Sequence, residues 1–387
     1  MITRRDWLGA AGLAGLATAA GGAFAEGGNA RQESVEPDPI DAEPPRHRLR
    51  FAVIGLDHYH IMSMTEAVIS GGGEVAAVLS TNTEGLKDRQ LADFHAKFGA
   101  VNVARSEDEI LQDPSIALVA AAPIPDQRAP LGIRVMQAGK DYLADKPAIT
   151  TLAQLDAVRA AIAETGRKFA ILYSERLGVR SAVQAGRLIQ AGAIGRVVQV
   201  VNLAPHRVNA PSRPAWFWDK ARYGGILTDI GSHQIDQYLY YTGSTRARVV
   251  AAQTANLNWP QQPAFEDFGD LLVAGDGGTG YIRVDWFTPD GLGVWGDGRL
   301  FVLGTEGYIE SRKYIDPAGR EGGNHLLLVD QEAIRYFDCS RGSLPFGRQF
   351  VDDLVNRTET AQSQAQALLA AELVLTAQRD ATAPVLD

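Results

Sequence analysis

A regular alternation of short apolar segments and longer amphipathic segments between residues 49 and 172 is the strongest constraint on the fold. Apolar runs of this kind are typical of strands that are buried on both faces of a parallel sheet. We predict strands at 51–55, 75–79, 116–121, 142–144 and 169–172, and helices at 61–70, 86–98, 128–138 and 152–165. Strand–helix units of roughly 20 to 30 residues predict a Rossmann-like, doubly wound parallel sheet.

The pattern changes after about residue 195, where apolar segments follow one another with few helices between them. Turn sequences such as Gly275-Asp276-Gly277-Gly278 separate these segments, which predicts a mostly antiparallel sheet. The predicted strands are 197–203, 249–254, 268–273, 280–287, 300–303, 308–311 and 326–329, and the predicted C-terminal helices are 346–356 and 361–378. The fold class is therefore α/β, with a Rossmann-like domain followed by an α+β domain built on a large open sheet. An open sheet face favours a homodimer or homotetramer.

The N-terminus has the features of an export signal. Thr3-Arg4-Arg5-Asp6-Trp7-Leu8 follows the twin-arginine pattern, a mildly apolar run leads to residue 25, and Ala23-Phe24-Ala25 is a small-x-small cleavage site. A membrane anchor is the alternative, although the run is short and rich in glycine. We predict a twin-arginine signal peptide at 1–25, a linker or arm at 26–48, a dinucleotide-binding domain at 49–172 and a substrate-binding and oligomerisation domain at 173–387, with the mature protein in the periplasm.

Composition excludes several classes of function. The net charge is −9 and lysines and arginines do not cluster, so nucleic-acid binding is not expected. Cys339 is the sole cysteine, which excludes an intrachain disulfide and a site built from several thiolates. After the leader, no segment is long and apolar enough to span a bilayer, so no membrane association is expected once the signal is cleaved.

The loop after the first strand is Gly55-Leu56-Asp57-His58-Tyr59-His60. A dinucleotide fingerprint has glycine at its first, third and sixth positions, and only Gly55 is retained here. Asp57 would repel a pyrophosphate unless its carboxylate turns away. This loop alone leaves nucleotide binding open.

Two further loops follow predicted strands. Ser80-Thr81-Asn82 lacks the acid that usually binds the NAD ribose; with Lys87 it could receive the 2′-phosphate of NADP, or it is a plain loop. Lys146, in Asp145-Lys146-Pro147, follows the fourth strand and is expected at the carboxyl edge of the sheet, where ligands of such folds bind.

The sharpest motif runs from Gly224 to Asp236 as GGILTDIGSHQID and predicts a glycine-rich entry into a helix. Asp229 and His233 are four residues apart and share a helix face, and a histidine held by a carboxylate one turn away suits general acid–base catalysis. Gly231 is unfavourable in mid-helix, so we expect another group to approach it closely.

The Asp-Lys-Pro segment, the Gly-Gly-x-x-x-Asp-x-Gly-x-His helix and the order of the elements resemble the Gfo/Idh/MocA oxidoreductase family, over nearly all of the chain after residue 48. The twin-arginine leader and Ser-x-Asn are similar to its periplasmic, glucose–fructose oxidoreductase-type members. Asp145, where the family usually has Glu, and the degenerate glycine loop are departures.

The resemblance implies an NADP- or NAD-dependent oxidoreductase, with a cofactor that can be tightly bound, acting on a hydroxyl of a sugar or sugar derivative. His233 would move the hydroxyl proton, Lys146 would hold that oxygen and Asp229 would bind a neighbouring hydroxyl. The expected cofactor contacts are Gly55, Asp57, His58, Tyr59, His60, Ser80, Thr81, Asn82, Lys87, Pro123 and Lys146. The expected substrate contacts are His206, Arg213, Trp216, Trp218, Arg222, Tyr223 and Asp236.

Other readings remain open. The scaffold could carry a glycoside-cleaving enzyme that oxidises its substrate transiently, a lyase or hydrolase without nucleotide, or a non-catalytic sugar-binding protein. Trp216 and Trp218 could equally form a core cluster. A metal site using His58, His60, His206 and His233 is not predicted, because the spacing of the last two gives it no support.

Overall fold

The computed structural model describes residues 32–37 and 44–384. Its first domain contains the predicted parallel sheet, in the order β3-β2-β4-β5-β6. The strands are β2 (Leu49–Leu56), β3 (Gly73–Leu79), β4 (Ile116–Ala122), β5 (Asp141–Asp145) and β6 (Phe169–Leu172). All neighbours are parallel. The chain leaves β2 toward β3 on one side and returns to β4 on the other, so the carboxyl ends of β2 and β4 form the switch point where such folds bind ligands.

Alternate residues of these strands face two separate hydrophobic layers. Phe51 and Val53 pack with α1 (His60–Ser70), α2 (Lys87–Phe98) and the C-terminal α10 (Phe346–Asn356). Ala52 and Ile54 face the layer that contains α4 (Pro125–Gln137) and α5 (Leu152–Thr165). The apolar runs predicted burial on both faces, and the structure confirms it. A short helix, α3 (Glu107–Leu111), precedes β4.

The second sheet has nine strands in the order β1-β14-β13-β12-β11-β7-β10-β9-β8. Seven were predicted, with small shifts at their ends: β7 (Val197–Pro205), β8 (Ala247–Ala255), β9 (Phe268–Gly275), β10 (Gly278–Asp285), β11 (Arg299–Gly304), β12 (Tyr308–Arg312) and β13 (His325–Val329). The pairs β7–β10 and β1–β14 are parallel and the others antiparallel, so the sheet is mostly antiparallel as expected.

Two strands of this sheet were not predicted. β1 (Gln32–Val35) lies in the segment expected to be a linker or arm, and it pairs in parallel with β14 (Ile334–Asp338). Its sequence, QESV, carries almost no apolar pattern. It is a strand because the edge of β14 offers it hydrogen-bonding partners, which local sequence does not record. The predicted leader, 1–25, lies outside the described residues.

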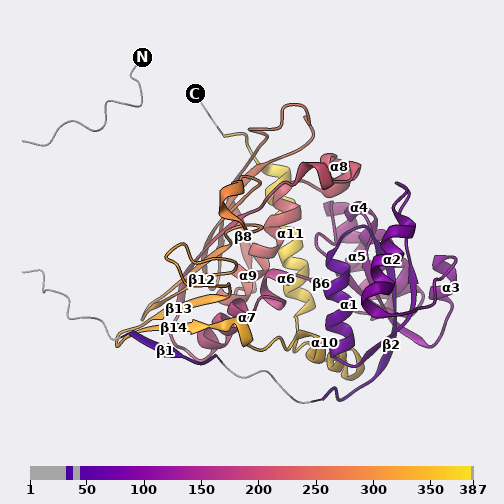
Figure 1. Ribbon diagram of the computed structural model, residues 1–387, viewed down its shortest axis with the longest axis horizontal. Helices are drawn as coiled ribbons and strands as arrows, with labels where there is room; N and C mark the ends of the chain where they lie inside the picture. The colour runs from indigo at the N-terminus through magenta and orange to yellow at the C-terminus, as the bar shows by residue number, and fades with distance from the viewer. Residues whose placement is uncertain (1–31, 38–43, 385–387) are drawn as a thin grey trace, which may run out of the picture. The chain divides into compact units, whose positions relative to one another are not determined.

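Helices cover one face of the nine-stranded sheet (Figure 1). They are α7 (Arg180–Gln190), α9 (Ser232–Thr242) and α11 (Gln364–Asp380). Two short helices precede them in the sequence, α6 (Ser174–Leu177) before α7 and α8 (Lys220–Tyr223) before α9. α11 also packs on α5 and β6, so it joins the two domains, which form one compact unit. Among the described residues, none of the helices has the length and apolarity that a bilayer crossing requires.

Apolar side chains remain exposed on strands of the large sheet. Leu272 on β9 is 43% exposed, and Val198, Val250 and Leu303 on other strands are also exposed. Such a surface supports the expectation that the sheet pairs with another copy of the chain.

We therefore expect the purified protein to be a dimer or tetramer at micromolar concentration by light scattering. Leu272→Arg should shift it toward monomer, because it places a charge on the apolar face. Leu257→Arg, which changes an equally exposed leucine outside the strands, is the matched control. A wild-type protein that is entirely monomeric would contradict this prediction.

Candidate active site

A cavity of about 130 Å³ lies where the carboxyl ends of β2, β4 and β5 meet residues of the second domain. The first domain contributes α4 and residues that follow these strands, and the second contributes α6, α9 and the segments that follow β7, β10 and β12. Its lining is rich in titratable and aromatic side chains. It consists of His58, His60, Pro125, Arg128, Lys146, Ser174, Glu175, His206, Arg213, Trp216, Phe217, Asp229, Ile230, His233, Trp286, Trp295, Lys313 and Tyr314.

Lys146 and Asp229 form an ion pair across the domain boundary. The Lys146 ammonium donates a hydrogen bond to Asp229 Oδ1 at 2.9 Å, and both groups are largely buried. Burial alone would raise the pKa of Asp229, but the Lys146 ammonium outweighs it and the pKa is lowered. A charged pair therefore faces the cavity. Both residues were predicted from the sequence as site candidates, but not as partners of each other.

Asp145, the residue before Lys146, is fully buried and joins three elements. Its carboxylate is hydrogen bonded to His58 Nδ1 at 2.5 Å and His60 Nδ1 at 2.9 Å, and it accepts from Arg128 and from the backbone N–H of Lys146. Burial opposes ionisation, but Arg128 and the two histidines hold the Asp145 pKa well below its usual value. The carboxylate that departs from the family pattern thus fixes the loop after β2.

His233 lies on α9, directly after a π-helical turn, Leu227–Gly231, that carries Asp229. Its side chain is buried, and its Nδ1 has no hydrogen-bond partner among the described residues. Burial, reinforced by the Lys146 charge, lowers the pKa of His233 well below its usual value, so the imidazole is neutral. The expectation that Asp229 holds His233 is wrong: the widened turn directs Asp229 to Lys146 instead.

Gly225, just before this turn, and Gly231, its last residue, have different roles. Gly225 has φ +92°, and a Cβ there would lie 2.3 Å from the side-chain amide of Gln378 on α11. This amide is held in place because it accepts a hydrogen bond from the Leu227 backbone N–H and donates one to Glu266. Gly225 is therefore required by a close approach. A Cβ on Gly231 would meet only Leu227, at 3.8 Å, so the close approach predicted there is wrong.

Three of the predicted substrate residues line the cavity. His206 bonds through Nδ1 to the Ala204 carbonyl, and Arg213 and Trp216 come from the segment between β7 and α8. The Arg213 guanidinium lies over Phe217, Trp286 and Trp295, and burial lowers its pKa to about 10. Trp286, Trp295 and the Lys313–Glu175 ion pair at 2.5 Å were missed because they lie far apart in the sequence and no local motif marks them.

The other four predicted substrate residues do not line the cavity. Trp218 packs against Trp259 and Phe265, so it belongs to an aromatic core cluster. Asp236 is fully buried and forms a two-point ion pair with Arg176 on α6. Arg222 pairs with Asp126, and the Tyr223 hydroxyl accepts from the Glu266 amide. Helical spacing placed Asp236 near His233, but its side chain faces α6.

The predicted cofactor loop retains a tight turn. Gly55 has φ +77°, and a Cβ there would lie 2.5 Å from the backbone nitrogen of Pro123, so only glycine fits. Asp57 turns toward the end of β3, where Asn82 donates to it at 2.6 Å and Thr81 at 3.3 Å. The carboxylate therefore does not face the helix N-terminus, which removes the repulsion that the sequence raised.

The remaining cofactor candidates lie around this loop. Ser80 donates to Gln90 of α2, Tyr59 is 76% exposed at the loop tip, and Lys87 is exposed at the start of α2. Because Asn82 accepts from the amides of Glu84 and Leu86 while it donates to Asp57, its side chain is occupied within the protein.

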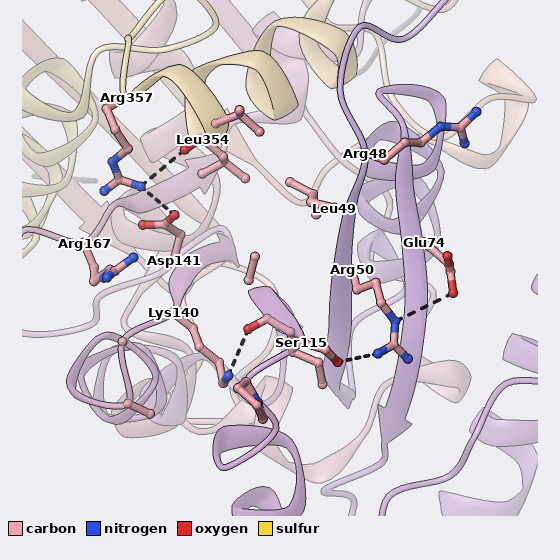
Figure 2. A pocket seen from close by; sticks show the side chains of 16 residues that line it. Arg48, Leu49, Arg50, Glu74, Ser115, Lys140, Asp141, Arg167, Leu354 and Arg357 are labelled. Atoms are coloured by element: carbon pink, nitrogen blue, oxygen red, sulfur yellow. Dashed lines mark hydrogen bonds and ion pairs between the residues drawn. The ribbon is translucent and has the colours of Figure 1, made fainter.

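A larger open hollow of about 1020 Å³ lies at the opposite, amino-terminal edge of the parallel sheet (Figure 2). Several of its charged side chains are held by protein partners: Arg357 by Asp141, Arg50 by Glu74 and Ser115, and Lys140 by the carbonyl of Ile116. It lacks the convergent acid–base groups of the smaller cavity, which is therefore the candidate active site.

Two family models match the chain. Residues 49–173 match "Oxidoreductase family, NAD-binding Rossmann fold", and residues 182–310 match the "GFO/IDH/MocA C-terminal domain". The chain belongs to the GFO/IDH/MocA oxidoreductase family. Its first domain is the NAD-binding Rossmann domain of that family.

Similar proteins agree with this membership. A solved structure from Erwinia carotovora atroseptica, named only as an oxidoreductase, is 48% identical, covers 87% of this chain and all of its own, and has a TM-score of 0.83. The scyllo-inositol 2-dehydrogenase (NAD(+)) of Bacillus subtilis is 27% identical over 68% of this chain and 73% of its own. The levoglucosan dehydrogenase of Pseudarthrobacter phenanthrenivorans is 27% identical over half of each chain.

The residues at the switch point fit a dinucleotide. The Gly55 turn is intact, α1 begins at this edge without a capping side chain, and Asp57 places a carboxylate beside the end of β3. A helix N-terminus suits a pyrophosphate and an acid at the second strand suits ribose hydroxyls. One difference is that the amides of Asp57 and His58 donate to the Ala122 carbonyl, which leaves phosphate binding to the start of α1.

We expect stability to fall as pH is lowered through the histidine range. Burial lowers the pKa of His206 to about 4, so between pH 6.5 and 4 the unfolded chain binds more protons than the folded one. In that window, a histidine of this kind lowers the free energy of unfolding by about 1.4 kcal/mol for each pH unit of acidification. His206→Asn, which can keep the bond to the Ala204 carbonyl, should make the free energy of unfolding depend less steeply on pH in this window. An unchanged slope would contradict this assignment.

Proposed function

We propose that this protein transfers hydride between a nicotinamide cofactor and a hydroxyl-bearing carbon of a sugar or cyclic polyol. The observation that carries the proposal is that Lys146, Asp229 and His233, from two domains, face one cavity at the switch point of the NAD-binding domain. The levoglucosan and inositol dehydrogenases among its relatives support a substrate of this class.

His233 is suited to move the hydroxyl proton. A neutral imidazole can accept it, and the partnerless Nδ1 gains a hydrogen bond when a hydroxyl enters the cavity. In the reverse direction the same nitrogen returns the proton to the carbonyl oxygen.

Lys146 and Asp229 prepare the site for charge that develops on the substrate oxygen. The Lys146 ammonium can donate to that oxygen while still paired, and the carboxylate keeps the ammonium in place. The second Asp229 oxygen can accept from a neighbouring hydroxyl, which orients a vicinal diol.

The aromatic side of the cavity supports a ring-shaped polar substrate. Trp216, Trp286 and Trp295 present apolar faces, and Arg213 lies among them as a hydrogen-bond donor. Sugar rings combine apolar faces with hydroxyl edges, and this lining matches both.

When bound, the nicotinamide supplies the hydride acceptor or donor. Gly55, Asp57 and the start of α1 would hold the dinucleotide, and Asp57 makes NAD the better fit. A carboxylate beside β3 accepts ribose hydroxyls and repels a 2′-phosphate. The expected role of Ser80, Asn82 and Lys87 in binding NADP is not favoured, because Asn82 is already committed to Asp57.

The first experiment is mass spectrometry of nucleotide released from denatured protein, followed by a sugar and polyol screen by NADH absorbance. With an active substrate, His233→Ala should lower kcat/KM by about a hundredfold or more. His95→Ala is the matched control. Unchanged turnover would remove His233 from the mechanism, and a protein that neither contains nor binds nucleotide would favour lyase or hydrolase chemistry instead.

Cofactor choice is tested separately. We expect kcat/KM for NAD to exceed that for NADP by about tenfold or more, because repulsion of a phosphate by one carboxylate is worth at least ~1.4 kcal/mol. Asp57→Asn should reduce the ratio of kcat/KM for NAD to kcat/KM for NADP without changing the KM for the sugar. A preference for NADP in the wild type would contradict the role given to Asp57.

Export is proposed on sequence alone. Arg4→Lys combined with Arg5→Lys should leave the precursor in the cytoplasm, whereas the wild-type chain should reach the periplasm and lose its first 25 residues or so. Cell fractionation with N-terminal sequencing measures both. Equal export of the two chains would contradict the twin-arginine route.

A further inference from the structure

We propose that His58 and His60 are ligands of a divalent transition-metal ion at the edge of the active-site cavity. The two histidines occupy the loop that in a dinucleotide fingerprint would be rich in glycine. Together with Asp145 they place potential ligand atoms within 4.8 Å of one another. This inference goes beyond the proposed hydride transfer and does not depend on it.

Asp145 orients both imidazoles in the manner of a carboxylate behind metal-bound histidines. Each oxygen of the Asp145 carboxylate already accepts from two donors. Oδ1 accepts from His60 Nδ1 and the Lys146 backbone N–H, and Oδ2 accepts from His58 Nδ1 and Arg128. The carboxylate is therefore saturated and acts as a support. Because Nδ1 of each ring carries the shared proton, Nε2 of each ring carries the lone pair.

Both imidazoles are partly exposed at the cavity. Asp145 is completely buried, whereas the side chains of His58 and His60 remain 25% and 32% exposed. Since Nδ1 of each ring is held at this buried carboxylate, we infer that the exposed part of each ring includes Nε2; both residues line the cavity. The ring centroids are 4.2 Å apart at 65°, so the two imidazoles are adjacent.

A second, independent observation points to a ligand at this place. His233 lies next to His60, with ring centroids 6.3 Å apart, and its buried Nδ1 lacks any partner among the described residues. A water or substrate hydroxyl bound to the metal would give that nitrogen the hydrogen bond it lacks. The arrangement leaves coordination positions open, as in catalytic rather than structural metal sites.

The chemistry of the donors selects the ion. Neutral imidazoles suit Zn²⁺, Co²⁺, Ni²⁺ or Cu²⁺ better than Mg²⁺ or Ca²⁺, which prefer oxygen ligands. Arg128 and Lys146 are close, but each is paired with a carboxylate, Asp145 and Asp229 respectively. Because the site has two protein ligands and lies beside the paired Arg128 and Lys146 side chains, we expect it to bind the metal ion with micromolar rather than nanomolar affinity.

The test uses the mature full-length protein, stripped with a chelator and free of nucleotide and sugar. Titration with Co²⁺ should produce visible absorption bands with a stoichiometry of one ion per chain, and Zn²⁺ should abolish them. Elemental analysis of protein purified without chelator should find sub-stoichiometric to stoichiometric zinc. Absence of any Co²⁺ spectrum at millimolar metal would overturn the proposal.

The variant His58→Asn/His60→Asn sharpens the assignment, because asparagine can keep a donor near Asp145 but has no counterpart of Nε2. It should bind Co²⁺ at least tenfold more weakly, whereas His95→Asn should bind like the wild type. Binding that is unchanged in the folded double variant, as judged by circular dichroism, would also overturn the proposal. Since these readouts need neither nucleotide nor sugar, a failure here is distinguishable from a failure of the dehydrogenase assignment.

Discussion

The buried carboxylate of Asp145 is the interaction on which the site depends. It lies at the end of β5. It accepts hydrogen bonds from the two histidines after β2, from Arg128 of α4 and from the backbone N–H of Lys146. A buried charge is stable only when several donors satisfy it, so removal of Asp145 would leave Arg128 uncompensated and release the β2 loop. The carboxylate thereby sets the position of Lys146, which reaches Asp229 in the second domain.

The second domain supplies its groups through one unusual backbone segment. The π-helical turn before α9 directs Asp229 to Lys146, and His233 faces the cavity with an Nδ1 that has no hydrogen-bond partner among the described residues. α11 supports this turn, because Gln378 accepts from the Leu227 amide and lies where a Cβ on Gly225 would be. His233 and Asp229 therefore come from one helix entry but have different surroundings, because only Asp229 is paired with Lys146 of the first domain.

Much of the fold was predictable, because hydrophobic periodicity reports burial directly. The five parallel strands and seven strands of the large sheet were found, and so were α1, α2, α4, α5, α9, α10 and α11, whereas α7 was missed. β1 was missed since its pairing with β14 is decided by tertiary contact and not by the pattern of QESV. In the site, Lys146, Asp229, His233 and Arg213 were found through motif and position, whereas Trp286, Trp295 and Lys313 were not, because nothing local marks loops that converge only in three dimensions.

The sequence by itself determined the class of the chain: the strand–helix alternation, Asp-Lys-Pro and the glycine-rich helix entry place it in its family, which the family models support. Side-chain direction was decided only by the tertiary structure. Helical spacing grouped Asp229, His233 and Asp236, yet Asp229 pairs with Lys146 and Asp236 is buried against Arg176. The Nδ1 of His233 has no hydrogen-bond partner in the part of the chain that the structure describes. Likewise the missing glycines of the first loop suggested a damaged cofactor site, but packing turns Asp57 toward Asn82 and brings His58 and His60 to Asp145. Spacing along a chain limits which groups can meet, whereas burial and charge compensation across elements determine which of them do.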